Sequence, residues 1–270
     1  MNLSQQSIAI QCALPREAAG FQSALQGRED SEIWGYHLSR GRYCNLDLLV
    51  CVGGMGAASS AACAQFLVDH YQPQALIFSG IAGSINPGLH IGDVMVSREQ
   101  HYAETNTAII AECPPYQEYF ASDPSLVSRA TNAAQELGYA RIPAVSELLS
   151  QGLWDGQVQA PRPGQGRREP GQKANFLVGN LSTSDRFNTS EAALSGLVQA
   201  FSADGEAMEE APAAQICGKC GVPFLCVRGV SNPCGQSYED LNEQEGDMDL
   251  AAQAAAQVTL KLLEGLSPQA

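Results

Sequence analysis

Positive charge is scarce in this chain. Its 270 residues include 15 lysines and arginines against 29 aspartates and glutamates, which gives a net charge of −14. Nucleic acids and anionic membrane surfaces would repel a protein of this charge as a whole. The composition therefore argues against both as partners, although one local pocket can still hold a small anionic ligand.

Long apolar runs are also missing. No stretch approaches the roughly 20 residues that span a bilayer, and residues 1–7 lack the basic start of a signal peptide. The nine cysteines are an odd number and lie mostly in apolar runs, as buried reduced thiols do. These features predict a cytoplasmic protein.

The sequence has only one cysteine pair with the spacing of zinc ligands. Cys217 and Cys220 form a single CxxC with no second pair or histidine nearby, whereas a structural zinc needs four ligands. We therefore interpret them as cysteines at the end of a helix. We expect no metal and no organic cofactor.

Apolar strand-like runs alternate with helical segments along the chain. Most of the strands are apolar throughout, as in a mainly parallel sheet that helices cover on both faces. We therefore expect a three-layer α/β/α fold with a mixed, mainly parallel central sheet, as one domain over residues 1–270. The predicted strands are residues 7–13, 36–40, 46–52, 75–79, 91–97, 175–179 and 224–230; the main helices are residues 57–69, 123–138, 189–200, 208–220 and 248–264.

Two helices have recognisable N-caps. Asp123 followed by Pro124 is typical of a helix start, and Asp247 is predicted to cap the last helix. Residues 152–174 differ from the rest because Gly, Pro, Gln and Arg dominate them. We expect a mobile surface insertion there. A basic lid is the less favoured alternative; it would use Arg162, Arg167 and Arg168.

Polar side chains gather where predicted strands end. Arg228, Ser231 and Asn232 follow one buried strand, and a carboxylate within residues 205–210 opens the preceding helix. In open α/β sheets, ligands bind at this carboxyl edge. Glycine-rich stretches at residues 52–56 and 79–84 also follow strands, where backbone N–H groups can face an anion or a sugar hydroxyl. The pattern predicts a ligand site, with a plain surface turn as the alternative.

Seven pieces of sequence, in order along the chain, carry a family resemblance: residues 13–17, 52–56, 79–84, 90–97, 184–187, 208–209 and 227–232. The chain resembles the superfamily of purine nucleoside phosphorylases and uridine phosphorylases, and within it the nucleosidases that cleave purine nucleosides with water. The insertion and the segment after Gly235 have no counterpart. The resemblance implies hydrolysis of an N-glycosidic bond and a homo-oligomer, with a dimer favoured.

The resemblance also implies roles for single residues. Glu209 would accept hydrogen bonds from the ribose hydroxyls, Met208 would pack beneath the sugar, and Phe187 would lie against the purine. Core packing is the alternative for Met208 and Phe187. Other residues implied to line the substrate site are Gly54, Ile81, Ala82 and Gly83.

Glu17 distinguishes hydrolysis from phosphorolysis. In the hydrolytic members a glutamate at this position takes a proton from water. Phosphorylases need donors for phosphate, and the side chain of Ile81 cannot donate. Arg16 beside Glu17 keeps a phosphorylase open as an alternative. Arg228 would orient Glu17 or the water, with a purely structural ion pair as the other interpretation.

Asn232 is the main departure from the methylthioadenosine/adenosylhomocysteine nucleosidases, which have an acidic residue there. An amide gives up no proton, but it donates and accepts hydrogen bonds, which suits a 6-oxopurine leaving group stabilised also by Ser231. Futalosine hydrolases combine A-x-P-x-E with R-G-x-S-N, as residues 13–17 and 228–232 do here, but residues 233–238 depart from the basic tail expected next. A futalosine-like substrate of the menaquinone pathway is favoured over methylthioadenosine or adenosylhomocysteine; a non-catalytic nucleoside-binding module also remains open.

Overall fold

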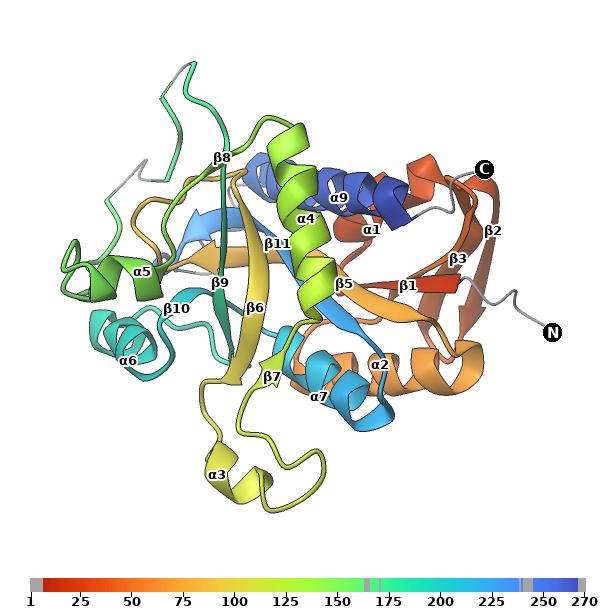
Figure 1. Cartoon of the computed structure of the whole chain (residues 1–270), viewed down its shortest axis with the longest axis horizontal. Helices are drawn as coiled ribbons and strands as arrows, with labels where there is room; N and C mark the ends of the chain where they lie inside the picture. Colours follow the sequence, from red (N-terminus) through yellow and green to blue (C-terminus); the bar gives the residue numbers. More distant parts are fainter. Residues whose placement is uncertain (1–6, 163–165, 170, 238, 240–244, 267–270) are drawn as a thin grey trace.

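The computed structural model describes residues 7–162, 166–169, 171–237, 239 and 245–266. Its strands form a mixed sheet in the order β10-β9-β6-β11-β5-β1-β4-β3-β2 (Figure 1). The long strands are β1 (Ser7–Cys12), β2 (Gln26–Ile33), β3 (Tyr36–Tyr43), β4 (Leu46–Val52), β5 (Ala75–Ser84), β6 (Val94–Tyr102), β9 (Asn175–Thr183), β10 (Ala203–Ala207) and β11 (Phe224–Pro233). Short β7 (Phe120–Ala121) pairs with β6, and β8 (Ala140–Arg141) pairs with β9.

The central strands are mostly parallel. β1 pairs in parallel with β4 and β5, β11 with β5, and β9 with β6 and β10. β6 is antiparallel to β11, and β3 is antiparallel to β2 and β4. β10 also pairs with β5 in the antiparallel sense. This extra pairing closes β5, β11, β6, β9 and β10 into a ring and brings their ends together.

Helices cover both faces of the sheet (Figure 1). Ile8 and Ile10 of β1 pack with helices on one face, whereas Ala9 packs with helices on the other, because successive side chains of a strand point to opposite faces. The first face carries α1 (Pro15–Ala24), α4 (Pro124–Glu136) and α9 (Glu245–Leu266); the second carries α2 (Ala57–Tyr71) and α7 (Glu210–Cys220). The three-layer expectation is confirmed.

Three further helices complete the described part. α5 (Val145–Ser150) and α6 (Glu191–Phe201) pack together in a separate apolar cluster near β10, and α3 (Thr107–Ile110) follows β6. No helix in the described ranges combines the length and apolar character that a membrane crossing requires.

Each predicted strand is present, but some boundaries were wrong. β5 continues to Ser84, so residues 79–84 are strand and not a turn. Asp123 caps α4 as predicted, since its Oδ1 accepts from the backbone N–H of Ser125 and Leu126. Asp247 does not cap α9, because the helix already begins at Glu245. β2 and β10 were missed.

The described residues of the 152–174 segment contain no helix or strand; residues 163–165 and 170 lie outside the described part. Arg168 Nε is 3.3 Å from Asp93 Oδ1, and Arg167 Nη2 is 3.0 Å from Asp247 Oδ2. These ion pairs tie the segment to the loop before β6 and to α9. Arg167 and Arg168 are thus each paired with an acidic residue of the chain itself.

Candidate active site

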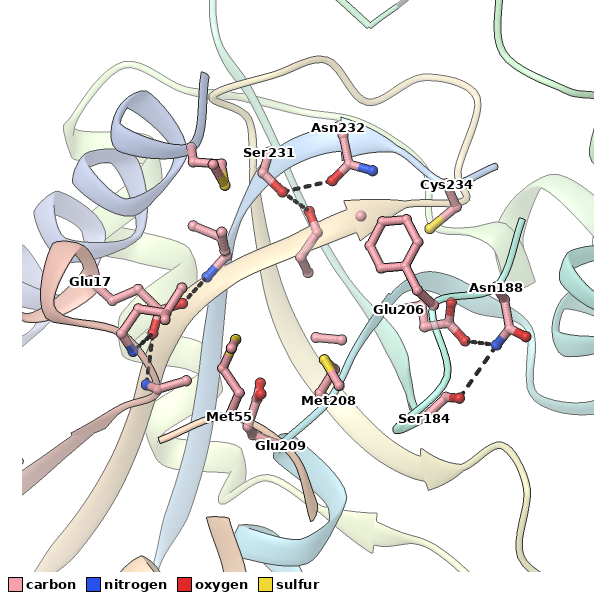
Figure 2. A pocket seen from close by; sticks show the side chains of 18 of the residues that line it. Glu17, Met55, Ser184, Asn188, Glu206, Met208, Glu209, Ser231, Asn232 and Cys234 are labelled. Carbon is pink, nitrogen blue, oxygen red and sulfur yellow. Dashed lines mark hydrogen bonds between the residues drawn. The ribbon is translucent and has the colours of Figure 1, made fainter. Parts of the chain in front are cut away.

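A cavity of about 260 Å³ opens where several strands end. Figure 2 shows Glu17 on one side of it and Glu206, Asn188 and Cys234 on the other, with Met208 and Asn232 between. Residues at the ends of β5, β10 and β11 line it, together with the start of α1 and the segment after β9. The site thus lies at the carboxyl edge predicted from the sequence.

Most residues predicted for the substrate site line this one cavity: Glu17, Ile81, Ala82, Gly83, Phe187, Met208, Glu209, Ser231 and Asn232. Arg228 does not, since it is fully buried behind the carboxylates. Gly54 was placed wrongly. It lines a separate surface hollow beside β3 and α2, and its neighbour Met55 reaches the cavity instead.

Glu17 is held by backbone N–H groups. Pro15 is the first residue of α1, which puts Glu17 in the first turn, where N–H groups lack helical partners. Its Oε2 accepts from Ala13 N at 2.7 Å and Leu14 N at 2.9 Å. Its Oε1 accepts from Ile81 N at 2.8 Å. The carboxylate is only 2% exposed and is therefore fixed in one orientation at the cavity wall.

Arg228 is the centre of the buried charges. Its Nη2 donates to Glu209 Oε2 at 3.0 Å and to Glu210 Oε2 at 2.8 Å. Its Nη1 lies 3.9 Å from Glu17 Oε1, and its guanidinium carbon lies 4.3 Å from the ring centroid of Phe78. One guanidinium thus holds carboxylates from α1 and from the start of α7.

The backbone of Ile81 contacts both Glu17 and Arg228. Its N–H donates to Glu17, and its carbonyl accepts from Arg228 Nη1 at 3.1 Å. The neighbouring Gly80 permits the arrangement, because a Cβ there would lie 2.5 Å from both Arg228 Nη1 and Glu17 Oε1. Any side chain at position 80 would separate the ion pair.

Glu209 lies at the point where α7 begins. Besides its contact with Arg228, its Oε1 accepts from Gly56 N at 3.0 Å at the start of α2. The N–H of Ala57 in the same turn donates to Asp185 Oδ1 at 2.8 Å. The glycine-rich stretch 52–56 therefore positions a carboxylate of the protein. Each carboxylate oxygen has two lone pairs, so Glu209 can still accept hydrogen bonds from a ligand.

Burial shapes the protonation of this cluster. Burial raises the pKa of Glu17, with Arg228 and the backbone N–H groups opposing the rise and Glu209 adding to it. Burial likewise raises the pKa of Glu210, again against the effect of Arg228. A carboxylate with a raised pKa accepts a proton more readily, which suits a general base.

Asn232 and Ser231 lie on β11 above the cavity. Ser231 Oγ lies 2.8 Å from Asn232 Oδ1 and 3.2 Å from the Ala82 carbonyl, and Asn232 Nδ2 donates to the Pro233 carbonyl at 3.1 Å. An amide NH₂ has two hydrogens, so its second N–H can serve a ligand. The pair offers hydrogen bonding without an acidic proton.

Glu206 and Glu210 are two site carboxylates that the sequence motifs did not identify. Both are buried; Glu206 lines the cavity, and Glu210 contacts Arg228. They lie in the stretch 205–210 that was singled out, but the sequence does not say which of its carboxylates faces the cavity. Burial raises the pKa of Glu206 to about 7, while a hydrogen bond from Asn188 opposes the rise.

The cysteines and acidic residues of the described ranges include no group of three or more that could hold a metal ion. Cys217 is buried and Cys220 is exposed at the end of α7.

The chain is similar to known proteins over nearly its whole length. The model of the phosphorylase superfamily matches residues 7–264. The chain is 26% identical to the 5′-methylthioadenosine/S-adenosylhomocysteine nucleosidase of Mycobacterium bovis over 265 residues, which cover 97% of this chain and 98% of that protein.

Solved structures share the fold. The match to a 5′-methylthioadenosine/S-adenosylhomocysteine nucleosidase of Colwellia psychrerythraea, in complex with adenine, has a TM-score of 0.78 at 21% identity and covers 100% of this chain and 99% of that one. The match to the futalosine hydrolase of Helicobacter pylori has a TM-score of 0.75 at 20% identity and covers 97% and 98%.

Replacing Arg228 by Met is expected to destabilise the fold by about 3–5 kcal/mol near pH 8, because three buried carboxylates lose their cation. When folding raises the pKa of a carboxyl group, the folded state loses stability as the pH rises above the pKa that the group has in the unfolded chain. The pKa of Glu17 and of Glu210 is already raised, and Arg228 restrains both. The deficit should therefore shrink near pH 5.

Urea unfolding at the two pH values measures this deficit. Arg129→Met is the matched control, since Arg129 is exposed on α4 and should change stability by less than about 0.5 kcal/mol. An equal deficit for Arg228→Met at both pH values would show that charge on the carboxylates is not its cause.

Proposed function

This chain belongs to the phosphorylase superfamily, and we propose that it is a purine nucleosidase that hydrolyses the N-glycosidic bond of its substrate. One observation carries the proposal: Glu17, Glu209 and Asn232, which are far apart in the sequence, line one cavity together with Met208 and Phe187. The names of the relatives, which are nucleosidases, support the same activity.

The cavity suits the charges that develop in the reaction. Cleavage of the bond leaves positive charge on the ribose and negative charge on the departing base. In the proposed mechanism, Glu17 takes a proton from the water that attacks C1′. Glu209 accepts hydrogen bonds from the 2′- and 3′-hydroxyls, and its charge stabilises the positive sugar. Met208 packs beneath the ribose and Phe187 against the base.

Water is favoured over phosphate as the nucleophile, because the hydrogen-bond donors near Glu17 are already engaged by groups of the protein. Ile81 N donates to Glu17, and Arg228 is buried among carboxylates. Arg16 is the residue that left a phosphorylase as an alternative interpretation. Its Nη1 donates to Asp249 Oδ1 at 2.9 Å and to the Glu245 carbonyl. A phosphate dianion near Glu17 and Glu209 would meet negative charge.

The leaving group is proposed to be a 6-oxopurine, as in a futalosine-like nucleoside. Asn232 and Ser231 can hydrogen-bond the departing base, but an amide supplies no acidic proton. A second candidate is 5′-methylthioadenosine or S-adenosylhomocysteine, because the relatives bear that name. We further propose a cytoplasmic homodimer, in which the partner covers Met55, a cavity residue that is 53% exposed in the single chain.

Product analysis tests the proposed reaction. Incubation with an inosine-type and an adenosine-type nucleoside should release free base and a free sugar in buffer without phosphate. The sugar can be identified by mass spectrometry. Dependence on phosphate, with a sugar 1-phosphate as product, would indicate a phosphorylase. Tight binding of both nucleosides without any turnover would indicate a nucleoside-binding module.

Glu17→Gln tests the general base. Glutamine keeps the shape of the side chain but does not accept the proton of water at neutral pH, so kcat should fall at least about 100-fold. Binding of the nucleoside, measured by calorimetry, should stay within about threefold. Glu29→Gln on the exposed strand β2 is the control and should retain full activity. Loss of binding together with turnover would show that Glu17 has a structural role.

Asn232→Asp tests recognition of the leaving base. A carboxyl group can donate a proton to N7, which helps a 6-aminopurine to leave, so the ratio of kcat/KM for adenosine-type over inosine-type substrates should rise about 10-fold or more. Asn132→Asp, on the exposed face of α4, should leave the ratio unchanged. Unaltered selectivity in Asn232→Asp would contradict the proposed contact.

A further inference from the structure

Glu206 is a buried carboxylate of the cavity to which the reaction above gives no task. It lies on β10, is 9% exposed and lines the cavity wall. Its Oε1 accepts a hydrogen bond from Asn188 Nδ2 at 2.5 Å. Burying a carboxylate beside a cavity costs free energy unless it is well partnered. A ligand that donates to it would offset part of that cost.

The ring of strands places Glu206 opposite Asn232. Gly83 of β5 pairs with Glu206 of β10 on one side and with Asn232 of β11 on the other. Neighbouring strands are about 4.8 Å apart, so the two backbones lie roughly 10 Å apart. Gly83 between them has no side chain, and a Cβ there would strike Cys234 Sγ at 2.6 Å. Figure 2 shows both side chains around the same part of the cavity, away from Glu17.

We propose that Glu206 reads the N1–H edge of a 6-oxopurine base whose N7 side faces Asn232, and so selects 6-oxopurines over 6-aminopurines. This inference rests on the proposed function, since it concerns the same cavity. N1 and N7 flank the C6 substituent on adjacent edges of a purine, so a base that presents N7 to Asn232 turns N1 toward the neighbouring wall. Glu206 lines the same part of the cavity as Asn232.

The selection follows from donors and acceptors. An ionised carboxylate only accepts hydrogen bonds. In a 6-oxopurine N1 carries a hydrogen and donates, whereas in a 6-aminopurine N1 is an acceptor and would face the carboxylate lone pairs. A buried polar group left without its partner is costly, which is how such sites reject a near-identical ligand.

The surroundings of Glu206 allow it to ionise near neutral pH. Burial raises its pKa to about 7, the Asn188 hydrogen bond lowers it, and the charges of Glu210 and Glu104 raise it. The buried thiol of Cys234 also lies near it. The ionised fraction grows as the pH rises through about 7, so preference for the 6-oxopurine should grow with it. Below that pH, the protonated carboxyl can donate to N1 of a 6-aminopurine.

The test compares wild type with Glu206→Gln and Glu104→Gln. Glu104 contributes to the electrostatic field at Glu206 but does not itself line the cavity; it pairs with the lining residue Arg186. Its variant therefore controls for loss of one nearby charge. Calorimetry gives the affinity for hypoxanthine and for adenine near pH 6 and pH 8. Steady-state kinetics gives kcat/KM for inosine-type and adenosine-type nucleosides.

In Glu206→Gln the preference for hypoxanthine over adenine near pH 8 should fall about 10- to 100-fold, with adenine affinity kept within about threefold or improved, because the new amide can donate to N1. The pH dependence of the preference should vanish. Glu104→Gln should retain both. A structural defect would instead lower the affinity for both bases together, and this result would overturn the inference. An unchanged preference for hypoxanthine would also overturn it.

The affinity and kinetic measurements separate this inference from the proposed function. If wild type cleaves no nucleoside but the base preference shifts as expected in Glu206→Gln, the nucleosidase proposal fails and the assignment of Glu206 stands. If wild type hydrolyses nucleosides but the preference does not move, the assignment alone fails. Wild type that binds neither base would contradict both.

Discussion

The guanidinium of Arg228 holds the site together. It is fully buried and contacts carboxylates that arrive from two separate helices. Exchange of such a buried ion cluster for apolar side chains is often neutral or stabilising, so stability alone does not account for its presence. Its consequence is geometric, because Glu17 and Glu209 are fixed around one cation at the wall of one cavity. Their carboxylates can then act on the same small ligand.

This arrangement depends on two glycines. Gly80 lets Arg228 and Glu17 pass close to the backbone of β5, and Gly83 leaves room for the Cys234 thiol beside Asn232. Both glycines lie on β5, the strand that pairs with β1, β10 and β11. The strand that closes the ring therefore also lets side chains of the site pack close to its backbone. Fold and site share one constraint, namely close backbone approach along β5.

Much of the fold could be predicted from the sequence, because buried strands such as 46–52 and 224–230 are mostly apolar. β2 was missed since its sequence, QGREDSEI, is polar and its residues are almost all exposed. β10 was missed because ADGEA has no strand-like pattern, and its strand state comes from pairing with β9 and β5. Tertiary contacts decided both elements.

Cavity residues that belong to a sequence motif were predicted. Cavity residues that only the fold brings to the cavity were missed. Glu17, Glu209 and Asn232 belong to motifs and converge on the cavity. Gly54 belongs to a motif too, but the turn at the start of α2 directs Met55 to the cavity in its place. The register of β10 against β5 puts Glu206 beside Gly83, and a single sequence does not reveal that register.

Two carboxylates of this cavity show how their surroundings separate their roles. Burial raises the pKa of both Glu17 and Glu206. Near Glu17, Arg228 and the N–H of Ile81 oppose that rise and favour the charged form. Glu206 is held by the neutral amide of Asn188 and repelled by Glu210, which leaves its pKa near 7. One cation beside Glu17 thus opposes its protonation, while the other side of the cavity has a carboxyl group, Glu206, whose charge depends on the pH.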